Sequence, residues 1–191
     1  MRVIGGTARG RRLLAPRGLD TRPTSDKVKE ALFSILAGMI GPLDGSSVLD
    51  VFAGTGSLGI EAMSRGAGQA VFIDAGREAV TVLAKNLQTT GFADRSTILT
   101  QNFRAAFTRL ESAGRNFRIV FLDPPYGKGL LEKSLEQLSE STMLDEGAVV
   151  VAEHSSREEI RSAFGPLRQC DRRVYGDTAL TFFTLTRKGS P

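Results

Sequence analysis

The sequence predicts an α/β fold with a mostly parallel sheet, and three observations support this prediction. Short apolar runs typical of buried strands alternate with segments of helical periodicity over most of the chain. The length of 191 residues suits one domain, and a content of 41% hydrophobic and 24% charged residues is globular. Because parallel neighbours need a crossover between them, this alternation predicts a sheet with helices on both faces.

The chain is expected to begin with an extension that packs on this sheet. Residues 2 to 14 contain two short extended runs broken by glycines, which predict a β-hairpin. The next segment predicts a helix of about four turns, with Thr24 or Ser25 as N-cap and Gly41-Pro42 as its stop. Its apolar positions recur at helical spacing, at Val28, Leu32, Ile35, Leu36 and Met39.

Five strand–helix pairs are expected after this helix. Their strands are Val48 to Phe52, Ala70 to Asp74, Thr97 to Thr100, Arg118 to Asp123 and Ala148 to Glu153. Their helices are Leu58 to Arg65, Arg77 to Thr90, Phe103 to Glu111, Leu130 to Leu138 and Arg157 to Phe164. Two further strands, Arg173 to Tyr175 and Leu180 to Thr186, flank the turn pair Gly176-Asp177 and predict an antiparallel hairpin at the sheet edge. The prediction is therefore a seven-stranded sheet in residues 41–187, preceded by the extension in residues 1–40.

The positive charge of the chain is concentrated at the N-terminus. The net charge is +4, yet residues 1 to 30 carry eight Lys and Arg against three Asp and Glu, so the remainder is nearly balanced. Guanidinium groups offer phosphate a rigid fork of donors and supply nucleic-acid affinity that does not depend on base sequence. The alternative is an ordinary solvated basic segment. The candidate contacts are Arg2, Arg9, Arg11, Arg12 and Arg17.

Several classes of protein are disfavoured. The single cysteine, Cys170, cannot form an internal disulfide or a cysteine-rich metal site, so no metal is expected. No apolar run approaches the roughly 20 residues that cross a bilayer, and the first residues lack the pattern of an export signal. We therefore expect a cytoplasmic protein, and a monomer, since no periodic apolar seam is left over once the sheet is covered.

The loop after the first predicted strand is of the nucleotide-binding type. Gly54, Gly56 and Gly59 form a GxGxxG pattern between a strand and a helix, where glycines let the backbone approach a ligand closely. Asp74 ends the next strand and is suited to bind ribose hydroxyls. A nicotinamide-dependent oxidoreductase fits this loop. Asp50, however, would repel a pyrophosphate and attract a cationic ligand, which favours S-adenosylmethionine.

The second chemical signal is Asp123-Pro124-Pro125-Tyr126 at the end of the fourth predicted strand. The exocyclic amine of a purine is a poor nucleophile, so acceptors must hold its hydrogens and direct its lone pair at a methyl group. Asp123 and the Pro124 carbonyl can supply these acceptors, and Tyr126 offers an aromatic face to a base taken out of its stack. Because the methyl donor is already activated, orientation can carry much of the reaction without a covalent nucleophile.

These motifs resemble, in order and over nearly the whole chain, the bacterial small-subunit ribosomal RNA guanine-N2 methyltransferases. The matching stretches are Arg2 to Leu13, Arg22 to Phe33, Leu49 to Ala62 and Asp123 to Tyr126. The resemblance implies a Rossmann-like S-adenosylmethionine-dependent methyltransferase fold. It also implies methyl transfer to the exocyclic N2 amine of one guanine in 16S rRNA, within an assembled or partly assembled small ribosomal subunit. In this interpretation the basic N-terminal segment contacts the RNA backbone.

The resemblance also implies the cofactor contacts. The methionine side would be lined by Asp50, Phe52, Gly54, Thr55 and Gly56. Asp74 would hold the ribose, and Asn102-Phe103 would meet the adenine, while Arg22 with Thr24 would close over the cofactor. The family commonly has Asp where this chain has Asn102, so an amide replaces a charged acceptor and is expected to bind the adenine amine more weakly.

Three other functions remain open. An adenine-N6 methyltransferase shares Asp-Pro-Pro-Tyr, although this chain has little length for a target-reading domain. A nicotinamide oxidoreductase would leave that motif unexplained. A non-catalytic RNA-binding module would need only the basic N-terminal segment. We interpret His154 as structural, Phe182 and Phe183 as core, and Cys170 as lacking the context of a base-attacking nucleophile.

Overall fold

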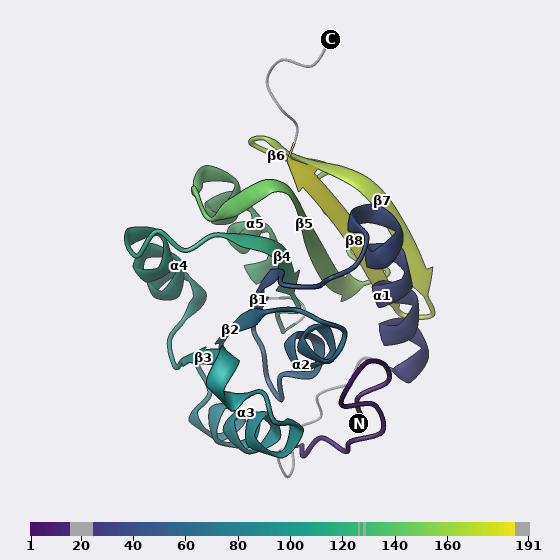
Figure 1. Cartoon of the computed structure of the whole chain (residues 1–191). Coiled ribbons are helices and arrows are strands. Elements are labelled where there is room, and N and C mark those ends of the chain that lie inside the picture. The colour runs from purple at the N-terminus through teal and green to yellow at the C-terminus, as the bar shows by residue number, and fades with distance from the viewer. Residues whose placement is uncertain (16–24, 126, 128, 186–191) are drawn as a thin grey trace.

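The sheet runs through the whole molecule and places the candidate motifs at one of its edges. A computed structural model describes residues 1–15, 25–125, 127 and 129–185. In this part of the chain, eight strands form one sheet in the order β3-β2-β1-β4-β5-β8-β7-β6, with helices on both faces (Figure 1). The first five of these are parallel, and the last three run antiparallel. The predicted α/β fold is confirmed, with eight strands in place of seven.

The parallel half of the sheet repeats strand and helix. Its strands are β1 (Ser47–Val51), β2 (Gln69–Ile73), β3 (Ser96–Leu99), β4 (Phe117–Leu122) and β5 (Leu144–Ser155). The helices that follow the first four are α2 (Ser57–Ser64), α3 (Arg77–Thr90), α4 (Phe103–Ser112) and α5 (Leu130–Glu140), and the short 3-10 helix η1 (Ala93–Arg95) precedes β3. Helix α1 (Asp26–Ile40) comes before the sheet. Ser25 caps α1 by accepting a hydrogen bond from the Val28 amide, and Gly41 ends it, as expected; Thr24 lies outside the described residues.

Strand order reverses between β1 and β4, which creates the crevice where such sheets bind ligands. The two strands are parallel neighbours in which Val51 pairs with Leu122. The residues that follow them, Phe52 and Asp123, therefore leave the same edge of the sheet side by side. This register brings the glycine loop next to the Asp-Pro-Pro segment, although about seventy residues separate them along the chain.

Two apolar cores cover the two faces of the sheet. One core lies against α1, α2 and α3, and the other lies against α4 and α5. The arm, residues 1–14, belongs to the first core through Val3, Ala8 and Leu13, which are all buried. Burying an aliphatic side chain of this size stabilises a fold by roughly 1.5–3 kcal/mol. These three residues thus join the arm to the first core.

The predicted N-terminal β-hairpin is reduced to a single bridge between Arg2 and Arg12. The two runs share backbone bonds, from the Val3 amide to the Arg11 carbonyl at 2.9 Å and from the Leu13 amide to the Met1 carbonyl at 3.1 Å. Between the runs, the Thr7 amide donates to the Ser64 carbonyl of helix α2 at 2.8 Å, so part of the arm bonds to the body rather than to the other run. The arm packs against the helices and lies close to the lower ends of α1 and α3 (Figure 1).

The helix predicted over Arg157 to Phe164 is wrong. The chain there forms a short strand, β6 (Ala163–Phe164), which turns through Gly165-Pro166 into β7 (Leu167–Tyr175). Ile160 and Phe164 are four residues apart and both pack into the second core, which imitates one face of a helix. Strand β8 (Thr178–Leu185) completes the predicted hairpin around Gly176-Asp177. None of the described helices is long and apolar enough to span a bilayer.

Candidate cofactor and base site

The glycine loop connects β1 to α2 and is packed tightly against α3. Gly56 has a φ of 80°, in the left-handed region that favours glycine. A Cβ built on Gly56 would lie 2.3 Å from Cδ1 of the buried Leu83. The loop therefore needs glycine here both for its backbone conformation and for its close approach to α3.

Asp74 joins the end of β2 to this loop. Its Oδ2 accepts a hydrogen bond from the Gly54 amide at 2.8 Å, and its Oδ1 accepts one from the Gly76 amide at 2.7 Å. The half-buried carboxylate keeps further acceptor capacity toward a ligand. The predicted ribose-binding acid therefore also holds the loop in place, a role that sequence analysis missed.

Asp50 is buried in β1 beneath the start of α2. Its Oδ2 accepts a hydrogen bond from the Gly59 amide at 2.8 Å, which ties the first turn of α2 to the sheet. Burial raises the pKa of Asp50 to about 7, against the opposing effect of the Gly59 bond, and the charge of Asp74 adds to the rise. The sequence indicated only a cofactor contact at this position and gave no sign of this anchoring bond.

Asp123 follows β4 directly and faces two other acids. Burial raises the pKa of its carboxyl well above the ordinary range, and the charges of Glu153 and Asp50 raise it further. Pro124 is buried and Pro125 is exposed; Tyr126 lies outside the described residues. Carboxyl groups of three neighbouring strands, β1, β4 and β5, are thus gathered at the reversal of strand order.

Glu153 is the member of this group that sequence analysis did not assign to the site. Its side chain is buried near the end of β5. Leu122 of β4 pairs with Ala152 of β5, so the next residues along these strands are Asp123 and Glu153. The strand register would have revealed this proximity, but the sequence alone does not give the register.

Two aromatic residues, Phe52 and Phe103, are in contact beside the glycine loop. Phe52 follows β1 with a φ of 64°, a rare conformation for a residue other than glycine that clusters at functional sites. Its ring lies 5.6 Å, centroid to centroid, from the ring of Phe103 at the start of α4. Asn102 caps α4 by accepting a hydrogen bond from the Ala105 amide at 3.0 Å. Phe52, predicted on the methionine side, and Phe103, predicted to meet the adenine, are therefore neighbours. Asn102, the other residue predicted to meet the adenine, has a structural task as the cap of α4.

The chemistry of these residues tests which ligand they suit. The ends of β1, β2, β4 and β5 carry Asp50, Asp74, Asp123 and Glu153. Such a set opposes the pyrophosphate of a dinucleotide and suits a cationic ligand with a ribose and a flat base. S-adenosylmethionine, with its ammonium and sulfonium groups and no phosphate, fits this site.

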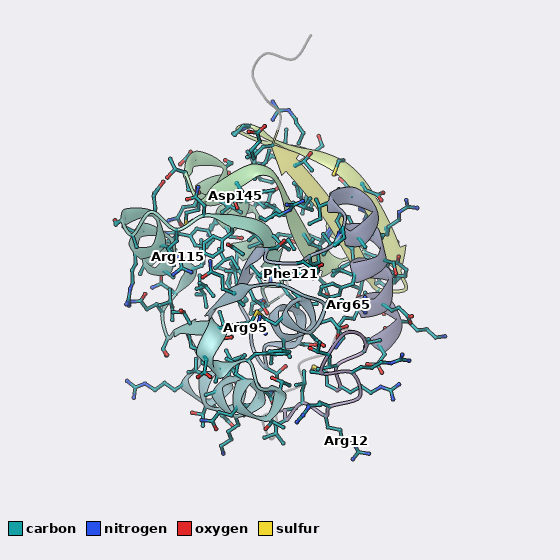
Figure 2. All side chains as sticks on the ribbon, in the orientation of Figure 1. Arg12, Arg65, Arg95, Arg115, Phe121 and Asp145 are labelled. Atoms are coloured by element: carbon teal, nitrogen blue, oxygen red, sulfur yellow. The ribbon has the colours of Figure 1, made fainter. Side chains whose placement is uncertain are left out.

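The arginines of the arm differ in their surroundings. Arg2 forms an ion pair with Asp26 at 2.9 Å, and Nη1 of Arg11 donates to the Thr89 carbonyl at 2.7 Å. Arg9 and Arg12 are exposed, and Arg12 points away from the body in Figure 2. Arg17 and Arg22 lie outside the described residues.

The residues interpreted as structural are embedded in the fold. The ring nitrogens of His154 contact the Ser155 carbonyl and the Thr181 hydroxyl, both at 2.9 Å, and burial lowers its pKa. Phe182 and Phe183 are buried in opposite cores, and burial raises the pKa of the Cys170 thiol. Within the described ranges, no group of three or more His, Cys, Asp or Glu is arranged to hold a metal ion.

Comparisons with known proteins agree with this geometry. A family model described as "Conserved hypothetical protein 95" matches residues 1–184. The chain belongs to this family. It is 39% identical over 184 residues to the "Putative rRNA methyltransferase YlbH" of Bacillus subtilis, covering 96% of this chain and 98% of that protein.

Two further relatives come from Escherichia coli. The chain is 40% identical over 153 residues to "Ribosomal RNA small subunit methyltransferase D", covering 80% of this chain and 74% of that protein. The solved structure of the "Putative methyltransferase yhhF" superposes with a TM-score of 0.82 at 34% identity and covers 97% of each chain. The family resemblance and the methyltransferase fold expected from the motifs are confirmed.

Proposed function

We propose that the protein transfers a methyl group from S-adenosylmethionine to the exocyclic N2 amine of a guanine in 16S rRNA. One observation carries the proposal: the register of β1 and β4 sets a phosphate-avoiding glycine loop directly beside Asp123-Pro124. This juxtaposition supports a reaction in which a methyl donor and a target amine meet at the carboxyl ends of these strands. The names of the relatives, one a putative rRNA methyltransferase and the other a ribosomal RNA small subunit methyltransferase, support the choice of substrate.

The cofactor is held by the residues around the glycine loop. The loop from Gly54 to Gly56 borders its methionine side, with the carboxyl group of Asp50 buried beneath it. Asp74 accepts hydrogen bonds from the ribose hydroxyls, Phe103 contacts the adenine, and Phe52, whose ring adjoins that of Phe103, borders the methionine side. Contacts from Asn102, Arg22 and Thr24 stay predictions. When bound, S-adenosylmethionine supplies a methyl group already activated for displacement.

Asp123 and the Pro124 carbonyl orient the target amine. Each accepts a hydrogen bond from N2, so that the nitrogen lone pair points at the methyl carbon. With S-adenosylmethionine bound, N2 would form the new bond to the methyl carbon, the electron pair of the C–S bond would stay with sulfur, and Asp123 would take up the proton that N2 loses. A carboxyl group with a raised pKa suits this uptake. Pro125 stiffens the segment, and Tyr126 is the predicted stacking partner of the extruded base.

The arm holds the RNA by its phosphates. Arg9 and Arg12 are exposed on an arm whose backbone is bonded to α2, so their guanidiniums are available to RNA phosphates. Arg2, Arg11 and Arg17 remain predicted contacts. We further propose that the substrate is the assembled or partly assembled small subunit, and that the protein acts as a monomer in the cytoplasm.

Methyl transfer from isotope-labelled S-adenosylmethionine tests the proposal. The panel consists of unmodified small subunits, stripped 16S rRNA, tRNA and DNA, followed by mass spectrometry of the digested nucleosides. We expect label in N2-methylguanosine, with more in the particle than in stripped RNA. Label in N6-methyladenine would overturn the proposed substrate. Absence of both label and cofactor binding would restore the oxidoreductase alternative.

A further inference from the structure

The arm is attached to α2 by buried polar contacts. Glu61, fully buried in α2, accepts hydrogen bonds from the Ile4 and Gly5 amides, both at 2.8 Å. Near the end of the same helix, Ser64 accepts from the Ala8 amide at 2.9 Å and donates to the Gly5 carbonyl at 2.6 Å. The arm therefore lies in a defined position on α2, the helix that follows the glycine loop.

Asn86 connects the arm to the middle of the glycine loop. This side chain of α3 is fully buried. Its Oδ1 accepts from the Leu14 amide at 2.8 Å, and its Nδ2 donates to the Leu14 carbonyl at 3.1 Å and to the Thr55 carbonyl at 2.9 Å. The paired bonds with Leu14 determine which end of the amide carries the nitrogen. The arm thus directs a donor at Thr55, the residue between two glycines of the loop.

Lys29 makes a similar connection at the other end of the arm. Its buried Nζ donates to the Arg2 carbonyl at 2.7 Å and to the Ser57 hydroxyl at 3.2 Å. It also forms an ion pair with Glu61 at 3.5 Å. Ser57 is the first residue of α2 and follows the loop directly. Each end of the arm therefore meets a buried side chain that also holds one part of the loop.

We propose that the arm is part of the scaffold of the cofactor loop, and that Asn86 is the positioning residue through which it acts. A glycine-flanked peptide has wide conformational freedom, so its orientation must be fixed by external bonds. Asn86 fixes the carbonyl of Thr55 and hence the plane of the peptide that includes the Gly56 amide, which donates to Ala53 at 2.7 Å. This inference rests on the proposed function only in identifying the ligand of the loop.

Two variants of the full chain separate this role from general stability. Asn86→Asp is nearly isosteric and keeps the acceptor for the Leu14 amide, but it aims an oxygen at the carbonyls of Leu14 and Thr55. Ser64→Ala is the matched control, because it removes two buried bonds of the arm at the opposite end of α2 from the loop. Asn86→Ala, which removes the bonds without introducing repulsion, serves if Asn86→Asp does not fold.

The readouts are hydrogen–deuterium exchange of peptides covering residues 53–58 in the ligand-free protein and calorimetric binding of S-adenosylhomocysteine. We expect the Asn86 variants to speed exchange in these peptides and to weaken binding, each by about tenfold, as loss of a buried hydrogen bond implies. In methyl transfer, the loss should fall on KM for the cofactor more than on kcat. Ser64→Ala should speed exchange only in residues 5–8 and change the Kd by less than about twofold.

Two results would overturn the inference. One is loop exchange that responds equally to Ser64→Ala and to the Asn86 variants. The other is loop exchange that stays unchanged in a folded Asn86 variant. If the expected exchange pattern appears but the wild-type chain binds neither S-adenosylmethionine nor S-adenosylhomocysteine, the proposed function fails while the link between arm and loop stands.

Discussion

The arm and the glycine loop are held to the body in opposite ways. The arm docks through its backbone, with the Ile4 and Gly5 amides on Glu61, and leaves the side chains of Arg9 and Arg12 exposed. The loop is held by side chains, Asp74 on Gly54 and Asn86 on Thr55, so its small residues and backbone border the ligand site. Long guanidiniums suit phosphates spread over a large surface, whereas a bare backbone suits close contact with a small ligand.

The two regions also differ in charge. The arm is rich in arginine, while the strand ends beside the loop carry four carboxyl groups. An anionic polymer and a cationic cofactor are therefore attracted to different parts of one molecule. The following predictions test this division, beginning with the largest effect.

Removal of the acid at the target amine should cost most. Asp123→Ala should lower kcat for methyl transfer by at least about a hundredfold. The variant removes both the hydrogen-bond acceptor of the amine and the group that takes up its proton. Binding of S-adenosylhomocysteine by calorimetry should change by less than about threefold. If cofactor binding fell as much as kcat, Asp123 would belong to the cofactor side of the site.

The buried acid below the loop should make stability depend on pH. The folded state raises the pKa of Asp50 from 3.8 to about 7, so between these values only the folded chain keeps the proton. Its contribution to the free energy of unfolding therefore decreases by roughly 1 kcal/mol per pH unit across this window and is constant above it.

Urea denaturation of the wild type and of Asp50→Asn at several pH values measures this contribution. The amide cannot ionise but keeps an oxygen for the Gly59 amide. The stability of the wild type relative to Asp50→Asn should therefore decrease from about pH 4 to pH 7 and then level off. A constant difference across this range would show that Asp50 titrates normally in the folded state.

A side chain added to the loop should affect both folding and binding. Gly56→Ala combines a positive φ with a Cβ only 2.3 Å from Cδ1 of Leu83. We expect it to lower the free energy of unfolding by about 2 kcal/mol and to weaken cofactor binding. Gly176→Ala is the control: it has a φ of 62° but no atom within 4 Å of the added Cβ. Its cost should be about 1 kcal/mol, without effect on binding. Equal effects on binding would contradict a role for close packing in the loop.

The smallest effect should come from the projecting arginines. Arg9→Gln with Arg12→Gln should weaken RNA binding several-fold and lower the slope of log Kd against log salt by about two. Filter binding across a salt series measures both quantities. Arg109→Gln with Arg115→Gln, near the end of α4, removes the same charge elsewhere and should leave the slope nearly unchanged. A slope that responds equally to both pairs would indicate an effect of net charge alone.

Local patterns were sufficient to predict most elements of the fold. Helix α3 runs from Arg77 to Thr90, the predicted bounds, because its apolar face is regular and Gly91 ends it. The bounds of the observed strands differ from the predicted bounds by one or two residues, except for β5 and β7, which are longer than predicted. The failure over Arg157 to Phe164 arose because spacing alone cannot distinguish a helix from a loop whose apolar side chains reach the same core. The exposed, polar residues of most of β7 likewise gave no strand pattern.

The residues of the candidate site that would contact the cofactor or the base could be predicted, but the buried residues that hold the loop and the arm in place could not. Gly54, Asp74 and Asp123 could be selected because motifs place them at strand ends. Glu61 and Asn86 could not, because their partners lie 57 and 72 residues away along the chain. A weak signal did exist: each is a polar residue on an apolar helix face, and such residues are rarely buried without a partner.

The long separation between the arm and its supports also determines when the arm can fold. The arm precedes α3 in the chain, so the partner of Leu14 appears only when α3 has been made. Until then Leu14 lacks this partner, and closing loops of this length must precede any gain from the contacts. The arm and the glycine loop should therefore reach their final conformations in the same late step of folding.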